Sequence, residues 1–175
     1  MIDYRLDGEV RSPAPALHAL SAEADRGGEA VAAAVRAAGR AAGDAIAGRL
    51  AAMVPLTDLD TNDFLAAVNA ETAARGLGTL EWQRELGTYA EVVVRESPDL
   101  AETALGASAQ PGTPFTEGFL EGLLAATAEE PVGVLRTPDD GGEGVHFIVG
   151  SPSLLRHVRI RLDRGETLEG ALEGI

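Results

Sequence analysis

The chain contains no cysteine and no lysine. Without cysteine it has no disulfide, no cysteine-ligated zinc or iron–sulfur cluster and no thiol nucleophile, which fits a reducing compartment. Without lysine it has no phosphate-loop lysine, no Schiff-base nucleophile and no lysine general base. These two absences exclude several classes of enzyme and metalloprotein before any motif is considered.

Positive charge and long apolar runs are scarce too. Fourteen basic residues stand against 28 acidic ones, so the 175-residue chain carries a net charge of −14. A field of that sign repels phosphate backbones, which argues against nucleic acid and anionic membrane surfaces as partners. No run reaches the ~18 apolar residues of a membrane span, and the N-terminus lacks a secretory signal. We therefore expect a cytoplasmic protein with no membrane span.

Two segments combine helical periodicity with paired glycines. Residues 28–53 are rich in alanine and predict a long helix that contains Gly39 and Gly43, four residues apart. Residues 114–130 predict a second helix, with Gly118 and Gly122 at the same spacing and Pro131 at its end. Each glycine costs up to about 1 kcal/mol relative to alanine inside a helix, but small residues allow another main chain to approach closely. A crossing of the two helices at these glycines explains both pairs.

The remaining elements follow from cap and turn signals. Helices are predicted over residues 13–26, from the cap residues 60–63 to near Gly76, and at 97–102. Strands at 79–86 and 89–95 predict one hairpin, in which Trp82 and Tyr89 are expected to be cross-strand neighbours. Strands at 132–136 and 145–149 predict a second hairpin. The tail from Ser151 fits a helix, the favoured interpretation, although residues 157–162 also alternate like a strand.

This order of elements predicts an α+β fold, with helices packed on one antiparallel sheet of two hairpins. We expect an N-terminal segment with a short helix over residues 1–27, a ligand-binding domain over 28–150, and a C-terminal helical tail of the same domain over 151–175.

The residues from Thr113 to Leu124, followed by a strand at 131–136 and by His146–Val149 after an acidic glycine turn, resemble the 4-vinyl reductase or hydrocarbon-binding domain family. The glycine-bearing helix at 33–50 and the segment 76–80 are similar to that family as well, so the resemblance covers about residues 28–150. It implies the fold of the core subunits of vesicle-tethering complexes, a homodimer, and an apolar cavity for a small hydrophobic or aromatic ligand.

The resemblance also bears on metal binding. Many members of the family carry zinc-binding cysteines at three places where this chain has Thr113-Pro114, Thr137-Pro138 and Val145-His146. Zinc is therefore not expected, and no other cofactor is predicted.

No catalytic set is apparent either. The only histidines, His18, His146 and His157, show no metal-ligand spacing. Glu117 and Glu121 are separated by one helical turn and are interpreted as a solvated helix face. The acidic run at 139–143 is interpreted as a hairpin turn.

We therefore predict a non-catalytic binding protein for a small hydrophobic or aromatic molecule, dimeric through the glycine-rich helix or a sheet edge. Two alternatives stay open: a tetrapyrrole carrier for vinyl reduction in bacteriochlorophyll synthesis, and a protein interaction module whose cavity is filled by its own side chains. The cleft beside the helix crossing and the facing strand supply the predicted ligand-binding residues, which are Phe115, Gly118, Phe119, Gly122, Leu123, Gly39, Gly43 and Phe147.

Overall fold

A computed structural model describes residues 19–20, 23–24, 26–96, 113–138 and 144–173. The predicted helix at 97–102, the acidic turn at 139–143 and His18 lie outside these residues, as does most of the predicted helix at 13–26. The described residues between 19 and 27 are helical, and Gly28 interrupts the helix with a φ of 72°.

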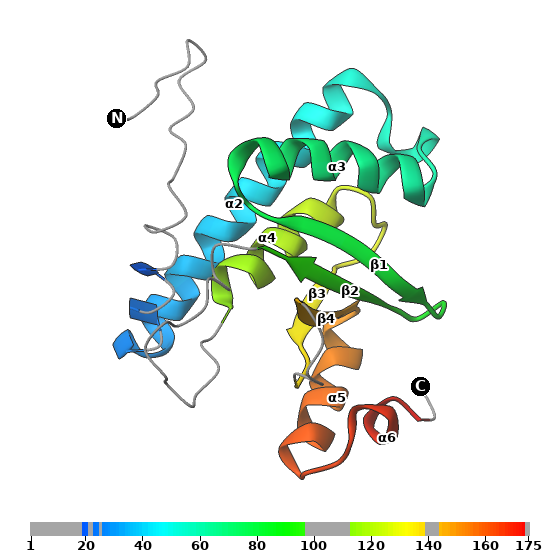
Figure 1. Cartoon of the computed structure of the whole chain (residues 1–175). Coiled ribbons are helices and arrows are strands. Elements are labelled where there is room, and N and C mark those ends of the chain that lie inside the picture. The colour runs from blue at the N-terminus through cyan, green and yellow to red at the C-terminus, as the bar shows by residue number, and fades with distance from the viewer. Residues whose placement is uncertain (1–18, 21–22, 25, 97–112, 139–143, 174–175) are drawn as a thin grey trace.

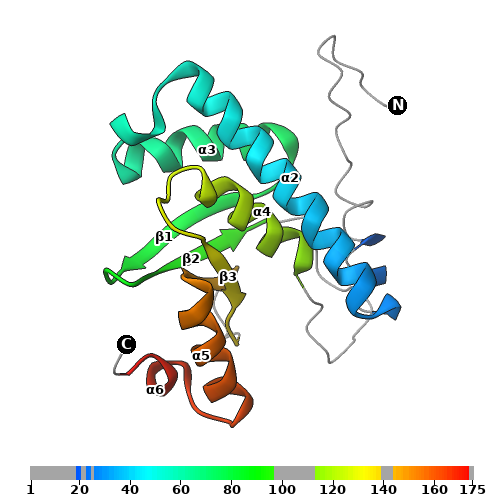
Figure 2. The same ribbon diagram turned by 180° about the vertical axis from the view of Figure 1, so that it is seen from behind.

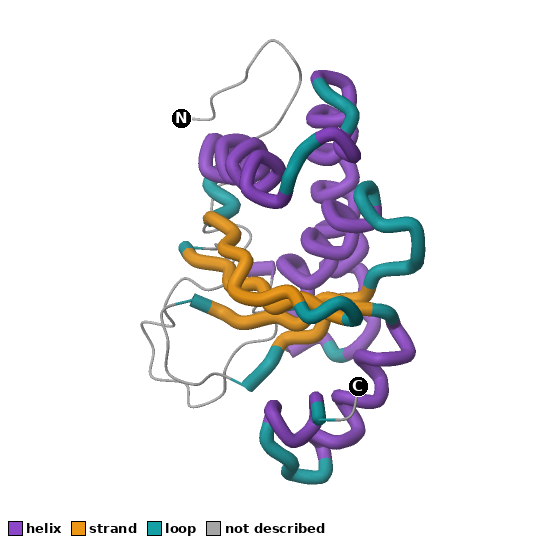
Figure 3. Tube along the Cα trace, turned by 90° about the vertical axis from the view of Figure 1, so that its right-hand side faces the viewer, coloured by secondary structure: helices purple, strands orange, loops and turns teal. Residues whose placement is uncertain are grey.

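A four-stranded antiparallel sheet separates two groups of helices (Figures 1 and 3). Its strands are β1 (Thr79–Glu85), β2 (Tyr89–Arg95), β3 (Gly133–Arg136) and β4 (Val145–Gly150), in the order β1-β2-β4-β3. The two sequential hairpins join through β2 and β4. The predicted α+β class, with one antiparallel sheet of two hairpins, is confirmed.

The larger group of helices covers one face of the sheet, called the inner face, and a smaller group covers the other, called the outer face. The inner group is α2 (Glu29–Met53), the 3-10 turn η1 (Leu56–Asp58), α3 (Thr61–Arg75) and α4 (Pro114–Ala125). Figure 2 shows α2 crossing α4, which lies nearer the strands. The outer group is α5 (Pro152–Asp163) and α6 (Leu168–Leu172), and α5 contacts β3 and β4.

Local capping explains where the helices begin and end. The Asp60 carboxylate accepts a hydrogen bond from the Asp63 N–H at 2.9 Å and begins α3, and Gly76 ends it in the left-handed conformation. The Ser151 hydroxyl accepts from the Leu154 N–H at 3.3 Å and begins α5, with Pro152 in its first turn. The predicted helix from Ser151 is therefore confirmed.

Two sequence predictions about the helices are wrong: the strand alternative for residues 157–162 and the end of the helix predicted over residues 114–130. The strand alternative for residues 157–162 fails because Ile160, which alternation would place beside the buried Val158, is 44% exposed. Helix α4 ends at Ala125 rather than at Glu130. The N–H and the hydroxyl of Thr127 both donate to the Leu124 carbonyl and close the last turn, and residues 126–131 are exposed and bury no apolar face.

The predicted cross-strand pair of Trp82 and Tyr89 is also wrong. A register irregularity between Trp82 and Arg84 pairs Trp82 with Val92, and Tyr89 pairs with Gly150 of β4. Trp82 packs against the inner core with α2, α3 and α4, whereas Tyr89 packs against the outer cluster with α5 and α6. The two aromatic side chains therefore lie on opposite faces of the sheet.

Side chains from the inner helices cover main-chain groups on both edge strands. Asn69 of α3 donates to the Leu80 carbonyl at 2.9 Å and accepts from the Leu80 N–H at 2.7 Å on β1. Arg36 of α2 donates to the Val134 carbonyl at 3.2 Å on β3. Uncovered edge groups invite pairing with other strands, so these contacts protect the sheet as well as attach the helices to it.

The two glycine pairs meet where α2 crosses α4. A Cβ on Gly39 would lie 2.9 Å from the Phe115 carbonyl carbon, and one on Gly43 would lie 2.7 Å from the Leu123 nitrogen. In the other direction, a Cβ on Gly118 would lie 2.8 Å from the Arg36 carbonyl carbon. Real Cβ atoms essentially never come this close to another main chain, so glycine is required at the crossing.

This crossing predicts a large effect of one methyl group. Gly118→Ala should lower the free energy of unfolding by about 1–3 kcal/mol, because the new Cβ overlaps rigid main chain. The matched control is Gly48→Ala, also in a helix, where nothing lies within 4 Å of an added Cβ. That variant should gain up to about 1 kcal/mol from helix propensity alone. Urea unfolding of both variants measures the difference, and equal effects would contradict close contact at Gly118.

Candidate functional site

The predicted ligand-binding residues occupy one region of the inner face. Phe115, Phe119 and Leu123 project from α4, and Phe147 comes from β4. All four side chains are buried in a single cluster with residues of α2, α3 and the strands. The four glycines lie directly behind them, in contact with main chain of the facing helix. The structure therefore brings the predicted residues together, with the aromatic groups toward the sheet and the glycines toward the α2–α4 contact.

Three hollows on the described surface are lined by other residues, and none of them includes Phe115, Phe119, Leu123 or Phe147. The four side chains are buried in the inner core cluster. A ligand there would be surrounded by apolar groups and would need few polar partners.

Trp82, the only tryptophan of the chain, is not among the predicted ligand-binding residues. Its side chain packs on the inner core from β1, and its indole nitrogen Nε1 is buried with no hydrogen-bond partner among the residues that the structure describes. The Thr113 hydroxyl, at the N-terminus of α4, is likewise buried without a partner. Buried indole N–H groups are normally hydrogen-bonded, so an unpartnered one marks a position where an acceptor would be bound favourably.

The sequence signal for Trp82 is its alternation with the apolar Leu80 on the predicted strand. The residue pattern does not show the register irregularity in β1, so it does not reveal that Trp82 faces the inner core.

A buried ion cluster lies beside the glycine crossing. The Arg36 guanidinium makes a two-pronged contact with Glu121, at 2.6 and 3.2 Å, and also donates to Glu117. The side chains of both glutamates are only 14% exposed. The interpretation of Glu117 and Glu121 as a solvated helix face is therefore wrong, because α2 covers that face and supplies a compensating charge.

The two kinds of group in this cluster respond differently to burial. Hydrogen bonding to Glu121 raises the pKa of Arg36, which keeps its charge. Burial raises the pKa of Glu117 above its ordinary value, and the charges of Arg36 and Arg159 oppose this shift only in part. The cluster has a structural role, because Arg36 of α2 contacts both glutamates of α4 and the Val134 carbonyl of β3.

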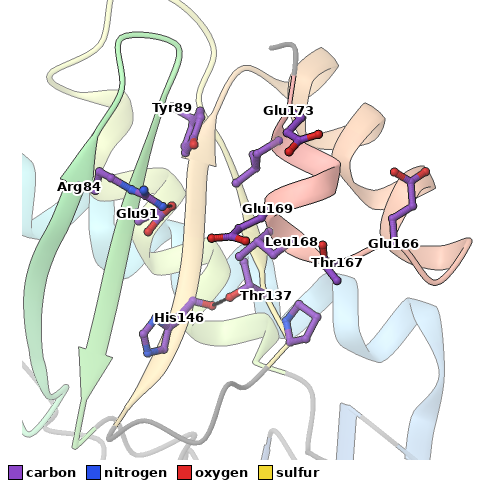
Figure 4. A pocket seen from close by; sticks show the side chains of 12 residues that line it. Arg84, Tyr89, Glu91, Thr137, His146, Glu166, Thr167, Leu168, Glu169 and Glu173 are labelled. Carbon is purple, nitrogen blue, oxygen red and sulfur yellow. Dashed lines mark hydrogen bonds and ion pairs between the residues drawn. The ribbon is translucent and has the colours of Figure 1, made fainter.

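A wider hollow, of about 930 Å³, lies on the outer face between the sheet and α6 (Figure 4). His146 and Glu91 reach it from the strands, and Glu169 and Glu173 reach it from α6. His146 lies on the outer face and the buried Phe147 on the inner one, so the prediction that they face opposite sides is confirmed. The Thr137 hydroxyl donates to the His146 carbonyl at 3.2 Å and fixes the strands at this point.

Among the described residues, no three histidine, aspartate or glutamate side chains converge as a metal site would require. Within the same part of the chain, no helix combines the length and apolar character needed to cross a bilayer.

No known protein family matches the chain, and no curated protein matches it. Solved structures with a similar fold include the phenol-responsive sensory domain of the transcription activator PoxR, in complex with phenol. The TM-score is 0.66 at 14% identity, over 94% of this chain and 90% of that domain. They also include trafficking protein particle complex subunit 3 from Naegleria fowleri, covalently bound to palmitic acid. Here the TM-score is 0.54 at 13% identity, over 78% of this chain and 91% of that one. The fold expected from the sequence resemblance is thus confirmed.

The ion cluster predicts a specific pH dependence. At Glu117 the folded state binds more protons than the unfolded state just above the ordinary glutamate pKa of about 4.3, because burial raises the folded pKa. The quantity to compare is the difference between two free energies of unfolding, that of the wild type minus that of Glu117→Gln. This difference should rise as pH falls through the raised pKa, and it should level off below the ordinary glutamate pKa. Urea unfolding across this range measures it, with the exposed Glu129→Gln as control. A difference that is independent of pH would contradict the prediction.

Proposed function

We propose that the chain is a non-catalytic binding protein of the 4-vinyl reductase type, which takes a small hydrophobic or aromatic molecule between its inner helices and its sheet. The ligand contacts Phe115, Phe119 and Leu123 of α4 and Phe147 of β4. Gly39, Gly43, Gly118 and Gly122 belong to the site because they hold α2 against α4 and so set the position of these walls.

Two lines of support come from outside the site itself. The fold is similar, over nearly the whole chain, to a domain that is described as phenol-responsive and was solved with phenol. A second protein of similar fold carries palmitic acid, which is also a predominantly apolar molecule. Both relationships are distant, so the ligand class in this chain has to be argued from its own residues.

The observation that carries the proposal is the unpartnered Trp82 indole nitrogen. It is a hydrogen-bond donor in an otherwise apolar cluster that also contains Phe119 and Phe147. A molecule with an apolar ring and one acceptor, such as a phenol, satisfies both features at once. Burial of the ring contributes roughly 25 cal/mol per Å² of apolar surface, and the hydrogen bond selects for the acceptor.

Because Trp82 is the only tryptophan, its fluorescence reports directly on the proposed site. Phenol should change this fluorescence in a saturable way, and benzene should bind more weakly because it offers no oxygen to the indole N–H. In Trp82→Phe, calorimetry should show the phenol preference reduced about five- to tenfold, the value of one hydrogen bond. Tyr89→Phe removes a polar group from the opposite face and should leave phenol binding unchanged.

Failure to bind phenol would favour the alternative in which the chain is a protein interaction module. If phenol, benzene and palmitate all fail to bind, and native mass spectrometry of the protein from its own host shows no co-purifying molecule, the inner cluster is only a core. A tetrapyrrole detected in that spectrum would instead select the carrier alternative.

A homodimer is part of the proposal. The glycine face of α2 contacts α4 of the same chain, so it is not free for a second copy. The contact is therefore proposed at a sheet edge, on β1 beyond the Asn69 contact, where residues 83–85 are exposed. Sedimentation should give about twice the chain mass of 18.1 kDa, and Gln83→Pro should reduce it to one chain. A wild-type protein that sediments as a single chain would contradict this.

A further inference from the structure

The side chains of the proposed inner site are buried, so a ligand reaches them only when part of the structure moves. Two of the three hollows on the described surface share residues with the inner cluster. One is lined by Ala47 and Leu56 and lies between α2, η1 and the end of α4, with no strand residue in its described lining. The other, of about 410 Å³, is lined by Val134 of β3. Because the proposed ligand lies between α4 and the sheet, the second hollow is the one on its path.

This second hollow, called the β3 hollow below, borders directly on the inner cluster. Val134 is buried in that cluster, and Val132 packs against it. Val134 pairs with Val149 of β4, which lies two residues after Phe147 and on the same face of the strand. The hollow is therefore only one strand away from a wall of the proposed site. Its described lining also includes Arg36, Glu121 and Leu155.

Helices α2 and α4 form one unit at this edge of the sheet. A Cβ on any of the four crossing glycines would overlap the main chain of the facing helix. Arg36 of α2 also contacts Glu117 and Glu121 of α4. The space between α4 and the strands therefore opens when both helices move together relative to the sheet.

Arg36 links this helix pair to the sheet. Its guanidinium donates to the Val134 carbonyl at 3.2 Å, in addition to its contacts with Glu121 at 2.6 and 3.2 Å. Hydrogen bonds from a charged group are roughly twice as strong as those between neutral groups. The Arg36 side chain is 35% exposed and lines the β3 hollow, so this link lies between solvent and the inner cluster. Movement of the helix pair away from β3 breaks it.

We propose that Arg36 is the latch of a ligand entrance, which opens when the α2–α4 pair moves away from β3 and connects the β3 hollow with the inner site. This inference rests on the proposed function, because it names the way by which a ligand reaches that site. At the opposite edge, Asn69 of α3 contacts both main-chain groups of Leu80 on β1 and holds the helices there. Arg36 contacts no ligand in this proposal and acts only on entry and release.

Hydrogen exchange of the ligand-free protein, labelled with ¹⁵N, tests the latch without any ligand. The Trp82 indole N–H is buried beside the inner cluster, and water reaches it only when that cluster opens. Arg36→Gln should speed up its exchange about tenfold, as expected for the loss of a hydrogen bond from a charged group. The amides of β4, a central strand, report unfolding of the sheet, and their exchange should change much less.

Arg49→Gln is the matched control. It removes the same charge from α2, and its side chain is 37% exposed, but it contacts Glu71 of α3 at 3.4 Å instead of α4 and the sheet. The exchange of the indole N–H should stay unchanged in this variant. Equal acceleration by Arg36→Gln and Arg49→Gln, or equal acceleration of the indole N–H and the β4 amides, would mean a general loss of stability and overturn the latch.

A second variant keeps the test valid if Arg36→Gln fails to fold. The single change leaves the two buried carboxylates of Glu117 and Glu121 without their counter-charge. Combining Arg36→Gln with Glu121→Gln keeps the net charge of the wild type and still removes the link to Val134. The double variant should show the same selective acceleration at the Trp82 indole.

Stopped-flow fluorescence of Trp82 with phenol then measures the entrance itself. Loss of the latch should raise the association and dissociation rates by the same factor, about tenfold, and leave the Kd unchanged, because the latch is closed with and without ligand. A changed Kd with an unchanged association rate would make Arg36 part of the binding wall and overturn the proposal.

The two proposals can fail separately. If phenol does not bind but Arg36→Gln still accelerates indole exchange selectively, the phenol-type site is wrong and the entrance stands. If phenol binds and indole exchange does not respond to Arg36→Gln, the latch is wrong and the proposed site stands.

Discussion

The close contact between α2 and α4 is the constraint on which the rest of the inner layer depends. With hydrogen atoms in place of side chains at Gly39, Gly43, Gly118 and Gly122, the two main chains come within a distance that excludes a Cβ. Helix α4 therefore lies between α2 and the sheet, and its large side chains pack in one cluster with residues of α2, α3 and the strands. The cost of glycine in two helix interiors is offset by the apolar surface that this arrangement buries.

The same contact explains how a partly buried arginine is held beside a mainly apolar layer. Because α2 lies so near α4, Arg36 reaches Glu117 and Glu121 and then the Val134 carbonyl on the edge of the sheet. A buried charge is tolerated only when it is paired and hydrogen-bonded, and here the guanidinium has partners on two elements. Asn69 plays a matching part at the other edge, where it pairs with both main-chain groups of Leu80. Each edge strand of the small sheet is thus held at one residue, Leu80 on β1 and Val134 on β3, by a side chain from the inner helices.

Polar groups without partners stand out against this background. Buried polar groups in proteins are normally hydrogen-bonded, so the buried Trp82 indole nitrogen, for which the described part of the chain offers no partner, is a distinctive feature of the site. This N–H lies against a cluster of apolar side chains, and a few polar groups in a mainly apolar lining are the general character of a small-molecule site.

The sequence by itself determined the elements and their class. Alanine content, cap residues such as Asp60 and Ser151, and turn glycines predict local structure because their effects act within a few residues along the chain. The glycine spacing also indicated that two helices would meet, since its energetic cost requires a compensating close contact. What only the tertiary structure decided is what lies opposite each side chain. The register irregularity after Trp82 separated it from Tyr89, and the cover of α2 turned Glu117 and Glu121 from a surface pair into a buried cluster. These outcomes depend on contacts between residues far apart in the chain, and the spacing of residues within one element carries no information about them.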